Sequence, residues 1–503
     1  MKKTQVARGL FLLFAAVALL FFYIYAHPLY IYDVDDWTYI TFSRHAIPSA
    51  HEWNPTRILP ETIMPLSALI GVDVIMPFTG DYIHSIGVAF AIVLVLFILF
   101  YLFNFGEAIK KIFGLKEGVV IFLTAAFLLM HFVVWKSKLT GTPHMLHGGN
   151  VTCFFFYLIP ELLNATLVMW LMANKTGNKE ADKKRNVVHT GLLILAFYLA
   201  LNSNLFHSII LASFAGANIL RSIISRLWDK GNKEGKNRHS RFKEFIRQNA
   251  IWIAIIVIWI IVHLFEMNGG RAGMANTGSV GFPIGETIRI LLSSLSGIKV
   301  TFLICVAGLV GIALAIWLTR KIKRTGKDSL DEQFGSNMIL LLVSFVTTLV
   351  YLILLCTKVS PNYIANTNVQ ISFLFWTVLM TLLCFGYIIA RYPRVVAILP
   401  LFVFIMIFET VVCSGKYENI YMDAATVKAL DENIICQVKE AESNGMINAD
   451  VYIPEHSSPD WPLPVSYGGE RIANSLYKHG IIKSPMKITL VPSQEINIEF
   501  GLE

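Results

Sequence analysis

Three aspartates lie close together in the segment Tyr30–Trp37, directly after the first long apolar run of the chain: Asp33, Asp35 and Asp36. A carboxylate in such a cluster can act as a general base or bind a polar ligand. The alternative is a helix cap, because the first N–H groups of a helix favour negative charge. A cap accounts for one aspartate, Asp35 or Asp36, but not for both together with Asp33. We therefore take Asp35 and Asp36 as the candidate catalytic residues.

Other polar residues near the same predicted membrane face are candidates for binding a substrate. Glu161 stands inside a predicted membrane helix, where a charged side chain is costly and by default indicates function. His144 and His147 could ligate a metal ion, but a third ligand is missing from the pattern, and loop histidines are more often solvated. We predict no metal site and leave the need for a divalent metal open. The substrate-binding candidates are Trp37, Trp53, Arg57, Glu61, His144, His147 and Glu161.

Four cations are expected on that face as well, and together they could contact an anionic ligand. Each of them alone is more often a contact to a lipid headgroup. As a set they supply positive charge for an anionic ligand, such as a phosphate. These candidates are Lys138, Arg271, Arg289 and Lys358.

The composition indicates what must position these residues. Of the 503 residues, 55% are hydrophobic and only 15% are charged, and the mean hydropathy is +0.59. A soluble protein of this size needs far more charge, so we predict a polytopic all-α membrane protein. A spanning helix needs roughly 20 apolar residues, and the polar residues Asn202–Asn204 divide one long run into two spans. The eleven predicted spans are Val6–Ala26, Ile83–Phe103, Gly118–Trp135, Val151–Ala173, the two halves of His189–Leu220, Ala250–Met267, Val300–Leu318, Met338–Cys356, Ile371–Ala390 and Val395–Ser414.

Charge predicts the orientation of these spans. With the amino terminus in the cytoplasm, about 27 of the 42 Lys and Arg residues fall into short cytoplasmic segments, as the positive-inside rule requires. The net charge of +8 and the pI near 9.0 are therefore mainly a topology signal, and we expect no nucleic-acid partner. An odd number of spans places the carboxyl terminus outside.

The chain divides into a predicted membrane domain, 1–415, and a small extracytoplasmic α/β domain, 416–503. In the tail, a helix over 427–441 precedes a β-α-β pattern: strand 450–454, helix 470–479 and strand 487–492, with a last strand at 496–500. The first outer loop, 27–84, carries the aspartates and two short helices, Trp37–His45 and Arg57–Ile70, which we expect to lie along the membrane surface. Cys413 and Cys436 could form one disulfide, and that pairing stays open.

This layout resembles the GT-C superfamily of membrane glycosyltransferases, and within it the bacterial glucosyltransferases of the O-antigen serotype-conversion type. The resemblance rests on Asp35-Asp36-Trp37, on the Asn-x-x-Arg pattern Asn54–Arg57, and on the late stretch Asn474–Gly480. It implies a GT-C-like fold in the bacterial plasma (inner) membrane, with the active site on the extracytoplasmic side. It also implies a polyprenyl-phosphate-linked hexose as donor and a polysaccharide or teichoic-acid-like acceptor in the cell envelope.

In the implied reaction, Asp35 accepts the proton of the acceptor hydroxyl as the hydroxyl oxygen attacks the anomeric carbon, and Asp36 orients Asp35 or binds the sugar. The sequence has no nucleotide-binding motif, which agrees with a lipid-linked donor. Two other interpretations share parts of this pattern. A polymerase or ligase of envelope glycans would use the same kind of donor, and a transporter or flippase predicts paired broken helices in two related halves.

Overall fold

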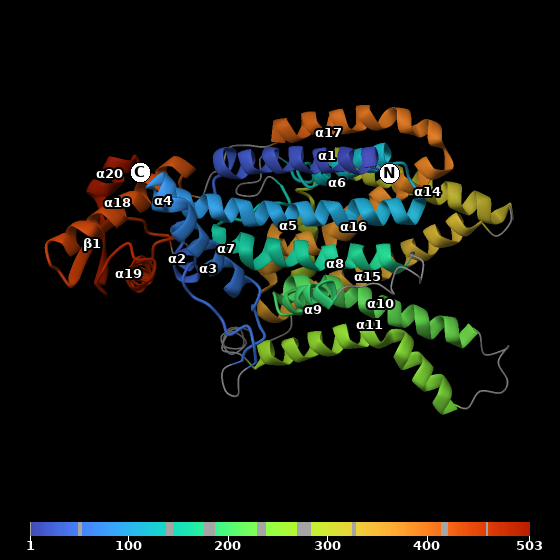
Figure 1. Ribbon diagram of the computed structural model, residues 1–503, viewed down its shortest axis with the longest axis horizontal. Coiled ribbons are helices and arrows are strands. Elements are labelled where there is room, and N and C mark those ends of the chain that lie inside the picture. Colours follow the sequence, from blue (N-terminus) through green and yellow to red (C-terminus); the bar gives the residue numbers. More distant parts are fainter. Residues whose placement is uncertain are drawn as a thin grey trace.

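The computed structural model describes residues 2–48, 53–136, 144–175, 187–228, 238–268, 283–323, 328–413, 421–458 and 461–502. Most of them form helices that run along one long axis, and the tail adds a two-stranded sheet (Figure 1). The helices and strands are α1 (Lys2–Phe21), η1 (Phe22–Ala26), α2 (Val34–Tyr39), α3 (Pro60–Ile70), η2 (Gly71–Ile75), α4 (Met76–Thr79), α5 (Tyr82–Phe113), α6 (Glu117–Met130), α7 (Val151–Cys153), η3 (Phe154–Leu158), α8 (Ile159–Lys175), α9 (Val187–Leu201), α10 (Leu205–Trp228), α11 (Arg238–Met267), α13 (Ile284–Leu295), α14 (Val300–Ile322), α15 (Ser329–Val359), η6 (Pro361–Ala365), α16 (Thr367–Arg391), η7 (Pro393–Ile398), α17 (Leu399–Cys413), α18 (Ala424–Ser443), β1 (Asn448–Pro454), α19 (Gly468–Lys478), β2 (Lys487–Ser493) and α20 (Gln494–Phe500).

Within the described residues, ten helical stretches are long and apolar enough to cross a membrane, which confirms a polytopic helical membrane protein. Nine of them coincide with predicted spans, and the tenth, Pro60–Thr79, is a longer form of a helix that we expected at the membrane surface. Two predicted spans are shorter helices, because α6 ends at Met130 and α9 ends at the polar break Asn202–Asn204. The ten stretches are Val6–Ala26, Pro60–Thr79, Tyr82–Phe113, Val151–Asn174, Leu205–Leu227, Phe242–Met267, Val300–Ile322, Ser329–Val359, Thr367–Arg391 and Pro393–Val411.

The stretch Pro60–Thr79 lies across one end of the helix bundle (Figure 1). Just before it, Leu59 N donates to Asn202 O at 3.2 Å, at the break between α9 and α10. Its middle packs on the first turns of α5 so closely that a Cβ on Gly71 would lie 2.7 Å from the Cα of Ile86. Both contacts are with the same end of the bundle, so this stretch has the transverse orientation of a surface helix.

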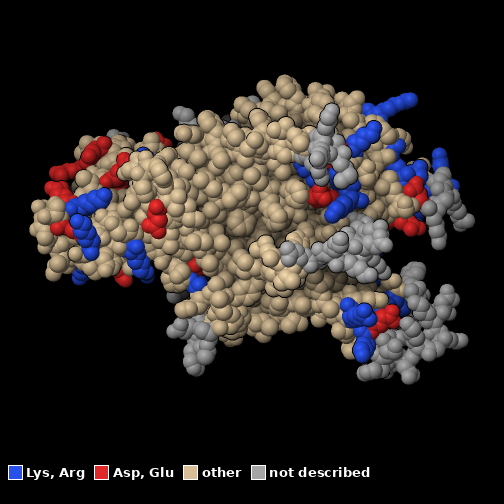
Figure 2. All heavy atoms as spheres, viewed as in Figure 1, with Lys and Arg blue, Asp and Glu red and all other residues tan. Residues whose placement is uncertain are grey.

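Helices α8 and α16 form the centre of the bundle. In the most apolar part of these two helices 89% and 83% of the residues are buried. The corresponding share is 11–17% for the spans of α1, α11, α14 and α17. The peripheral helices expose large apolar side chains such as Phe14, Phe404 and Phe408, and the middle of the surface in Figure 2 carries almost no Lys, Arg, Asp or Glu. Such a surface is stable only against lipid.

Charged side chains gather at the two ends of the bundle (Figure 2). At the end that holds the amino terminus, which we call the basic end, several cations are paired with acids. Arg8 Nε lies 2.5 Å from Glu117 Oε1, and Arg391 lies 2.7 Å from Asp328 and 2.5 Å from Asp331. These pairs fasten helices to one another. The opposite end, which carries the first outer loop and the tail, is called the tail end.

The tail contains the predicted β-α-β unit. Strands β1 and β2 pair in parallel, and α19 forms the crossover between them. A Cβ on Gly469 would lie 2.2 Å from Ile488 O, so only a glycine lets α19 approach the sheet this closely. The predicted last strand at 496–500 is wrong, because Ser493 caps a helix, α20, at this point. Cys436 is a free and exposed thiol.

The tail packs directly on the first outer loop. Ser475 Oγ of α19 donates to Trp37 O, and Lys428 Nζ of α18 lies 2.6 Å from Asp81 Oδ2, just before α5. The contacts join residues that are hundreds of positions apart in the sequence. The tail therefore covers the helix that carries the acidic motif.

Candidate functional site

Helix α2 holds the three aspartates in three different environments. Asp33 is its N-cap, and its side chain accepts the N–H of Asp35 at 2.8 Å. Asp36 completes a capping box by accepting the N–H of Asp33 at 3.2 Å. These caps start the helix at Val34, so the predicted helix Trp37–His45 is displaced: the observed helix begins earlier and ends at Tyr39.

Asp36 is fully buried and fully hydrogen-bonded. Its Oδ1 accepts the N–H and the hydroxyl of Thr152, both at 2.6 Å, and its Oδ2 accepts the N–H groups of Tyr32 and Asp33, both at 3.2 Å. Burial raises the pKa of Asp36, the charge of Asp33 raises it further, and the donors of Thr152 and Tyr32 oppose this rise. No lone pair is left for a substrate. Our expectation of a catalytic Asp36 is therefore corrected: this carboxylate joins α2 to α7.

Asp35 is the exposed member of the motif. Within the described residues its carboxylate makes no hydrogen bond and no ion pair, whereas its backbone N–H is held by Asp33. The side chain thus projects from the first turn of a helix whose other two acids fix its position. Of the two predicted catalytic residues, only Asp35 is open to a substrate.

Trp37 lies beneath the tail, and a further acid, Asp431, is buried on the tail helix α18. Trp37 is fully buried, so the side chain that we expected to bind substrate belongs to the core. Asp431 of α18 is also fully buried, and neither of its carboxylate oxygens has a hydrogen-bond partner among the described residues. Burial, and then the charge of Asp36, raises the pKa of Asp431 well above its usual value. One feature of the sequence could have indicated this burial, because Asp431 directly follows Leu430 of the apolar stripe of that helix.

Arg57 and Glu61 belong to an ion-pair cluster at the tail end. Asn54 Oδ1 accepts a backbone N–H two residues on and forms a turn in which Arg57 has a φ of 60°, a rare value for a residue with a side chain. Arg57 Nη2 lies 3.3 Å from Glu266 Oε1 of α11, while Glu61 is buried and has arginines on both sides. Trp53 donates its indole N–H to a tyrosine hydroxyl at 3.1 Å. The predicted substrate-binding residues Trp53, Arg57 and Glu61 therefore lie in one region of the structure. Their polar groups contact other side chains of the protein there.

Glu161 lies in the centre of the bundle, where two helices are interrupted side by side. The π-helical turn η3 precedes it, and Asn204 at the α9–α10 break donates to Phe156 O of that turn at 2.9 Å. Glu161 is 2% exposed, and its Oε2 lies 3.6 Å from Nδ1 of His207 without a hydrogen bond. A charge at this depth is costly, so this acid is a second candidate for function.

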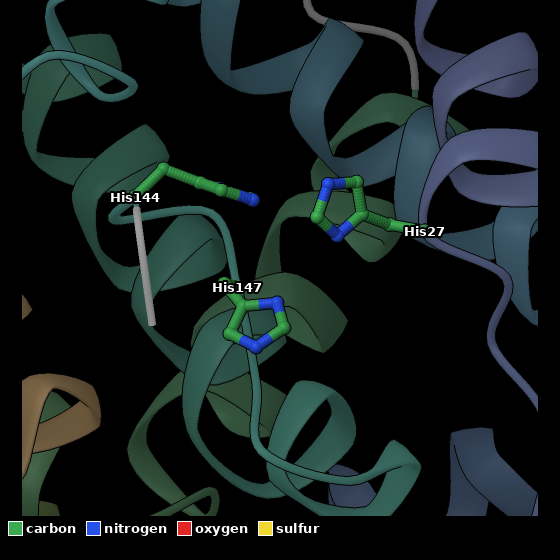
Figure 3. Close-up of side chains that lie close together, drawn as sticks. All are labelled: His27, His144 and His147. Atoms are coloured by element: carbon green, nitrogen blue, oxygen red, sulfur yellow. The ribbon is translucent and has the colours of Figure 1, made fainter. Parts of the chain in front are cut away.

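His144 and His147, in the loop before α7, meet a third histidine, His27, which lies at the start of the first outer loop. The three imidazoles face one another (Figure 3), and their ligand nitrogens all lie within 4.8 Å of one another. Burial, and then the neighbouring His147 and His27, lowers the pKa of His144 well below its usual value, which keeps the ring neutral. The sequence pattern missed His27 because it lies 117 positions before His144; its place at the end of the first span was the signal.

Two of the four predicted phosphate-binding cations lie in described parts of the chain. Arg289 is exposed on α13, and Lys358 is exposed near the end of α15. A hydrogen bond of 2.8 Å between Thr357 and Thr287 joins these two helices. Lys138 and Arg271 lie outside the described residues.

A cavity of about 930 Å³ lies between the start of α5 and helix α18 of the tail. Charged and polar side chains line much of it, among them Asp81, Glu432, Lys439 and Glu440. None of the predicted site residues is part of its lining. The cavity is therefore large enough for a ligand but separate from the acidic motif.

Comparisons with known proteins add no family to this geometry. No protein-family model matches the chain, and no significant match is found among curated proteins or solved structures. The site must be interpreted from its own residues.

Proposed function

We propose that the protein is a glycosyltransferase that moves a hexose from a polyprenyl-phosphate-linked donor to a glycan of the bacterial cell envelope. In this proposal the basic end lies in the cytoplasm, as the positive-inside rule favours. The tail end, with the acidic motif, then faces the outside. The fold is of the GT-C type in this proposal.

The exposed carboxylate of Asp35 is the observation that carries the proposal. A general base must reach its proton within hydrogen-bond distance and must be held in place. The exposure of Asp35 leaves it accessible to a hydroxyl, and the caps of Asp33 and Asp36 together with the tail hold α2 in place, which supports this role. Asp36 cannot take this role without breaking its four hydrogen bonds, and Asp431 is fully buried.

A lipid-linked donor also fits the surface of α13. This helix exposes Ile284, Ile288 and Leu292 along one side, and it buries Thr287 and Leu291 on the other. Such an amphipathic helix offers apolar surface to a polyprenyl chain at the membrane boundary. Arg289 on the same helix supplies a cation for the phosphate, and Lys358 supplies a second on the neighbouring helix.

The reaction is a direct displacement. The acceptor oxygen attacks the anomeric carbon, and the bond from that carbon to the phosphate oxygen breaks, so the lipid phosphate leaves with the electron pair. Asp35 takes the hydroxyl proton late, as the new bond forms, because a carboxylate is a far weaker base than an alkoxide. The anomeric centre is inverted. Arg289 and Lys358 stabilise the charge on the leaving phosphate.

The test compares surface glycans of cells that lack the gene and carry either wild-type protein or Asp35→Asn. Loss of this base is expected to lower sugar transfer about 10²–10⁴-fold at normal protein levels in the membrane. Asp73→Asn is the matched control, since Asp73 is an exposed aspartate of the same loop. Wild-type modification in Asp35→Asn would refute the role of Asp35. Shortened glycan chains, rather than the loss of one side-chain sugar, would instead identify a polymerase or ligase.

A second candidate function is transport of a lipid-linked sugar across the membrane. The paired interruptions at η3 and Asn202–Asn204, with buried Glu161 beside them, favour it, because transporters place substrate sites at broken helices. The measurement is flipping of a fluorescent polyprenyl-phosphate sugar in proteoliposomes. Transport predicts that Glu161→Gln blocks flipping and that Asp35→Asn does not, which is the opposite of the pattern expected for sugar transfer.

A further inference from the structure

We propose that His27, His144 and His147 bind one divalent transition-metal ion of the Zn²⁺ type, in a buried site where the first span meets the loop before α7. This inference is independent of the proposed sugar transfer. It follows from the distances, the chemistry and the surroundings of three side chains (Figure 3).

The distances fit a metal site that closes by small side-chain rotations. The three ligand nitrogens lie within 4.8 Å of one another. Two imidazole nitrogens bound to one tetrahedral Zn²⁺, each at about 2.0–2.1 Å, are about 3.3 Å apart. Rotations that bring each nitrogen inward by about 1 Å therefore complete the site, with the backbone left in place.

The backbone that carries these ligands is already fastened. Tyr23 of η1 donates its hydroxyl to Leu146 O at 2.6 Å, between the two loop histidines. Met145 N donates to His131 O at 2.7 Å, and His27 N donates to Phe22 O at 2.7 Å. The end of the first span and the loop are thus held against each other before any metal binds, which lowers the entropic cost of assembling the ligands.

The imidazole of His144 is buried with ring nitrogens that are unsatisfied in the described parts of the chain and that a metal ion could satisfy. His144 is 2% exposed, and within the described residues neither of its ring nitrogens has a hydrogen-bond partner. A buried polar group left in this state costs about 1–3 kcal/mol, and coordination to a metal removes the deficit for one nitrogen. The ring stacks on Phe132 at 4.8 Å between centroids and meets Phe22 edge-on, so its plane is set.

The choice of metal follows from the ligand atoms. Three imidazoles and no carboxylate favour Zn²⁺, Cu²⁺, Ni²⁺ or Co²⁺, and they disfavour Ca²⁺ and Mg²⁺, which take oxygen ligands. Three protein ligands leave one position for a water molecule or another small ligand. The bound ion would fasten the first span to the loop that leads, through Asn150 and Thr152, to the acidic motif.

The experiment uses the full chain in detergent, with any affinity tag removed and metal stripped. Added Zn²⁺ is expected to bind at one equivalent by elemental analysis, and added Co²⁺ is expected to give visible d–d bands of a nitrogen-ligated site. Metal should also raise the thermal unfolding midpoint of the wild-type protein. Mg²⁺ should do none of these things.

Variants separate binding from folding. His144→Ala is expected to weaken Co²⁺ binding at least about 100-fold. The matched control is His131→Ala, which removes a buried imidazole from the same region but outside the cluster and should keep the bands. Absence of stoichiometric Zn²⁺ and of Co²⁺ bands in the wild-type chain would overturn the proposal, whether or not the variants fold. Equal loss in both variants would also overturn it.

Discussion

The acidic motif and the histidine cluster are two buried polar regions at the tail end, and they differ in how far their polar atoms are satisfied. Asp36 accepts four hydrogen bonds, whereas His144 has no hydrogen-bond partner among the described residues for either ring nitrogen. The first pattern is that of a residue that holds the fold, and the second is that of a residue that lacks a ligand. Residue type and spacing alone had suggested a catalytic role for Asp36 and no metal site at His144.

The difference shows where the capacity for chemistry lies. A side chain can act on a substrate or a metal only with atoms that the fold has not already used. By this criterion Asp35 is the one of the three neighbouring aspartates that remains a catalytic candidate. The two histidines of the loop before α7, which lacked a third metal ligand in the sequence pattern, gain His27. The two regions are also connected, because Thr152, which binds Asp36, follows His147 by five residues.

The sharpest test of this comparison is Asp36→Ala. The substitution leaves four buried donors without an acceptor, each at a cost of about 1–3 kcal/mol, so the loss of stability should be at least about 4 kcal/mol. Asp35→Ala should change stability by less than about 1 kcal/mol. Unfolding midpoints in detergent, against heat or denaturant, measure both. Similar losses in the two variants would show that the acids are not divided as described.

A smaller effect is expected from two adjacent glycines beside the histidine cluster. A Cβ on Gly148 would lie 2.9 Å from Phe154 Cδ2 and 3.0 Å from Phe154 N, whereas a Cβ on Gly149 would meet nothing within 4 Å. Gly148→Ala should therefore cost about 1–3 kcal/mol by overpacking and should weaken Co²⁺ binding through His147. Gly149→Ala should change neither property. If both variants bind Co²⁺ like the wild type, the position of this loop does not control the site.

The smallest effect concerns pH. A carboxyl group whose pKa is raised in the folded state keeps a proton that the unfolded chain has released, so stability falls as the pH rises from about 3.8 toward neutral. The charge of Asp33 contributes to this rise at Asp36. Asp33→Asn removes that charge but keeps a residue that can cap α2.

The unfolding midpoint of Asp33→Asn should therefore fall less steeply with pH than that of the wild-type protein. The raised pKa of Asp431 acts in both proteins, so the difference between the two pH profiles isolates the Asp33–Asp36 pair. Burial raises the pKa of Asp33 itself to about 6, so this difference contains the ionisation of both acids. Parallel profiles would mean that neither the ionisation of Asp33 nor its effect on Asp36 contributes to the pH dependence of stability.

Much of the fold follows from local sequence patterns. Runs of apolar residues predicted nine of the ten stretches that are long and apolar enough to cross a membrane, the polar residues at Asn202–Asn204 predicted the break between α9 and α10, and alternating and helical periodicity predicted the β-α-β unit of the tail. The failures were also local: the cap at Ser493 turned the expected last strand into α20. Patterns of this kind act within one helix or strand, where hydropathy and hydrogen bonding along the chain decide the outcome.

The candidate site depended on packing between distant segments. The sequence by itself determined that an acidic motif follows the first span, that two histidines lie three residues apart, and that Glu161 is inside a membrane helix. Only the tertiary structure decided that Thr152 donates two hydrogen bonds to Asp36, that Glu266 pairs with Arg57 and that His27 joins His144 and His147. The physical reason is that each of these contacts joins elements separated by more than 100 positions, and burial and side-chain packing, not local spacing, bring such elements together.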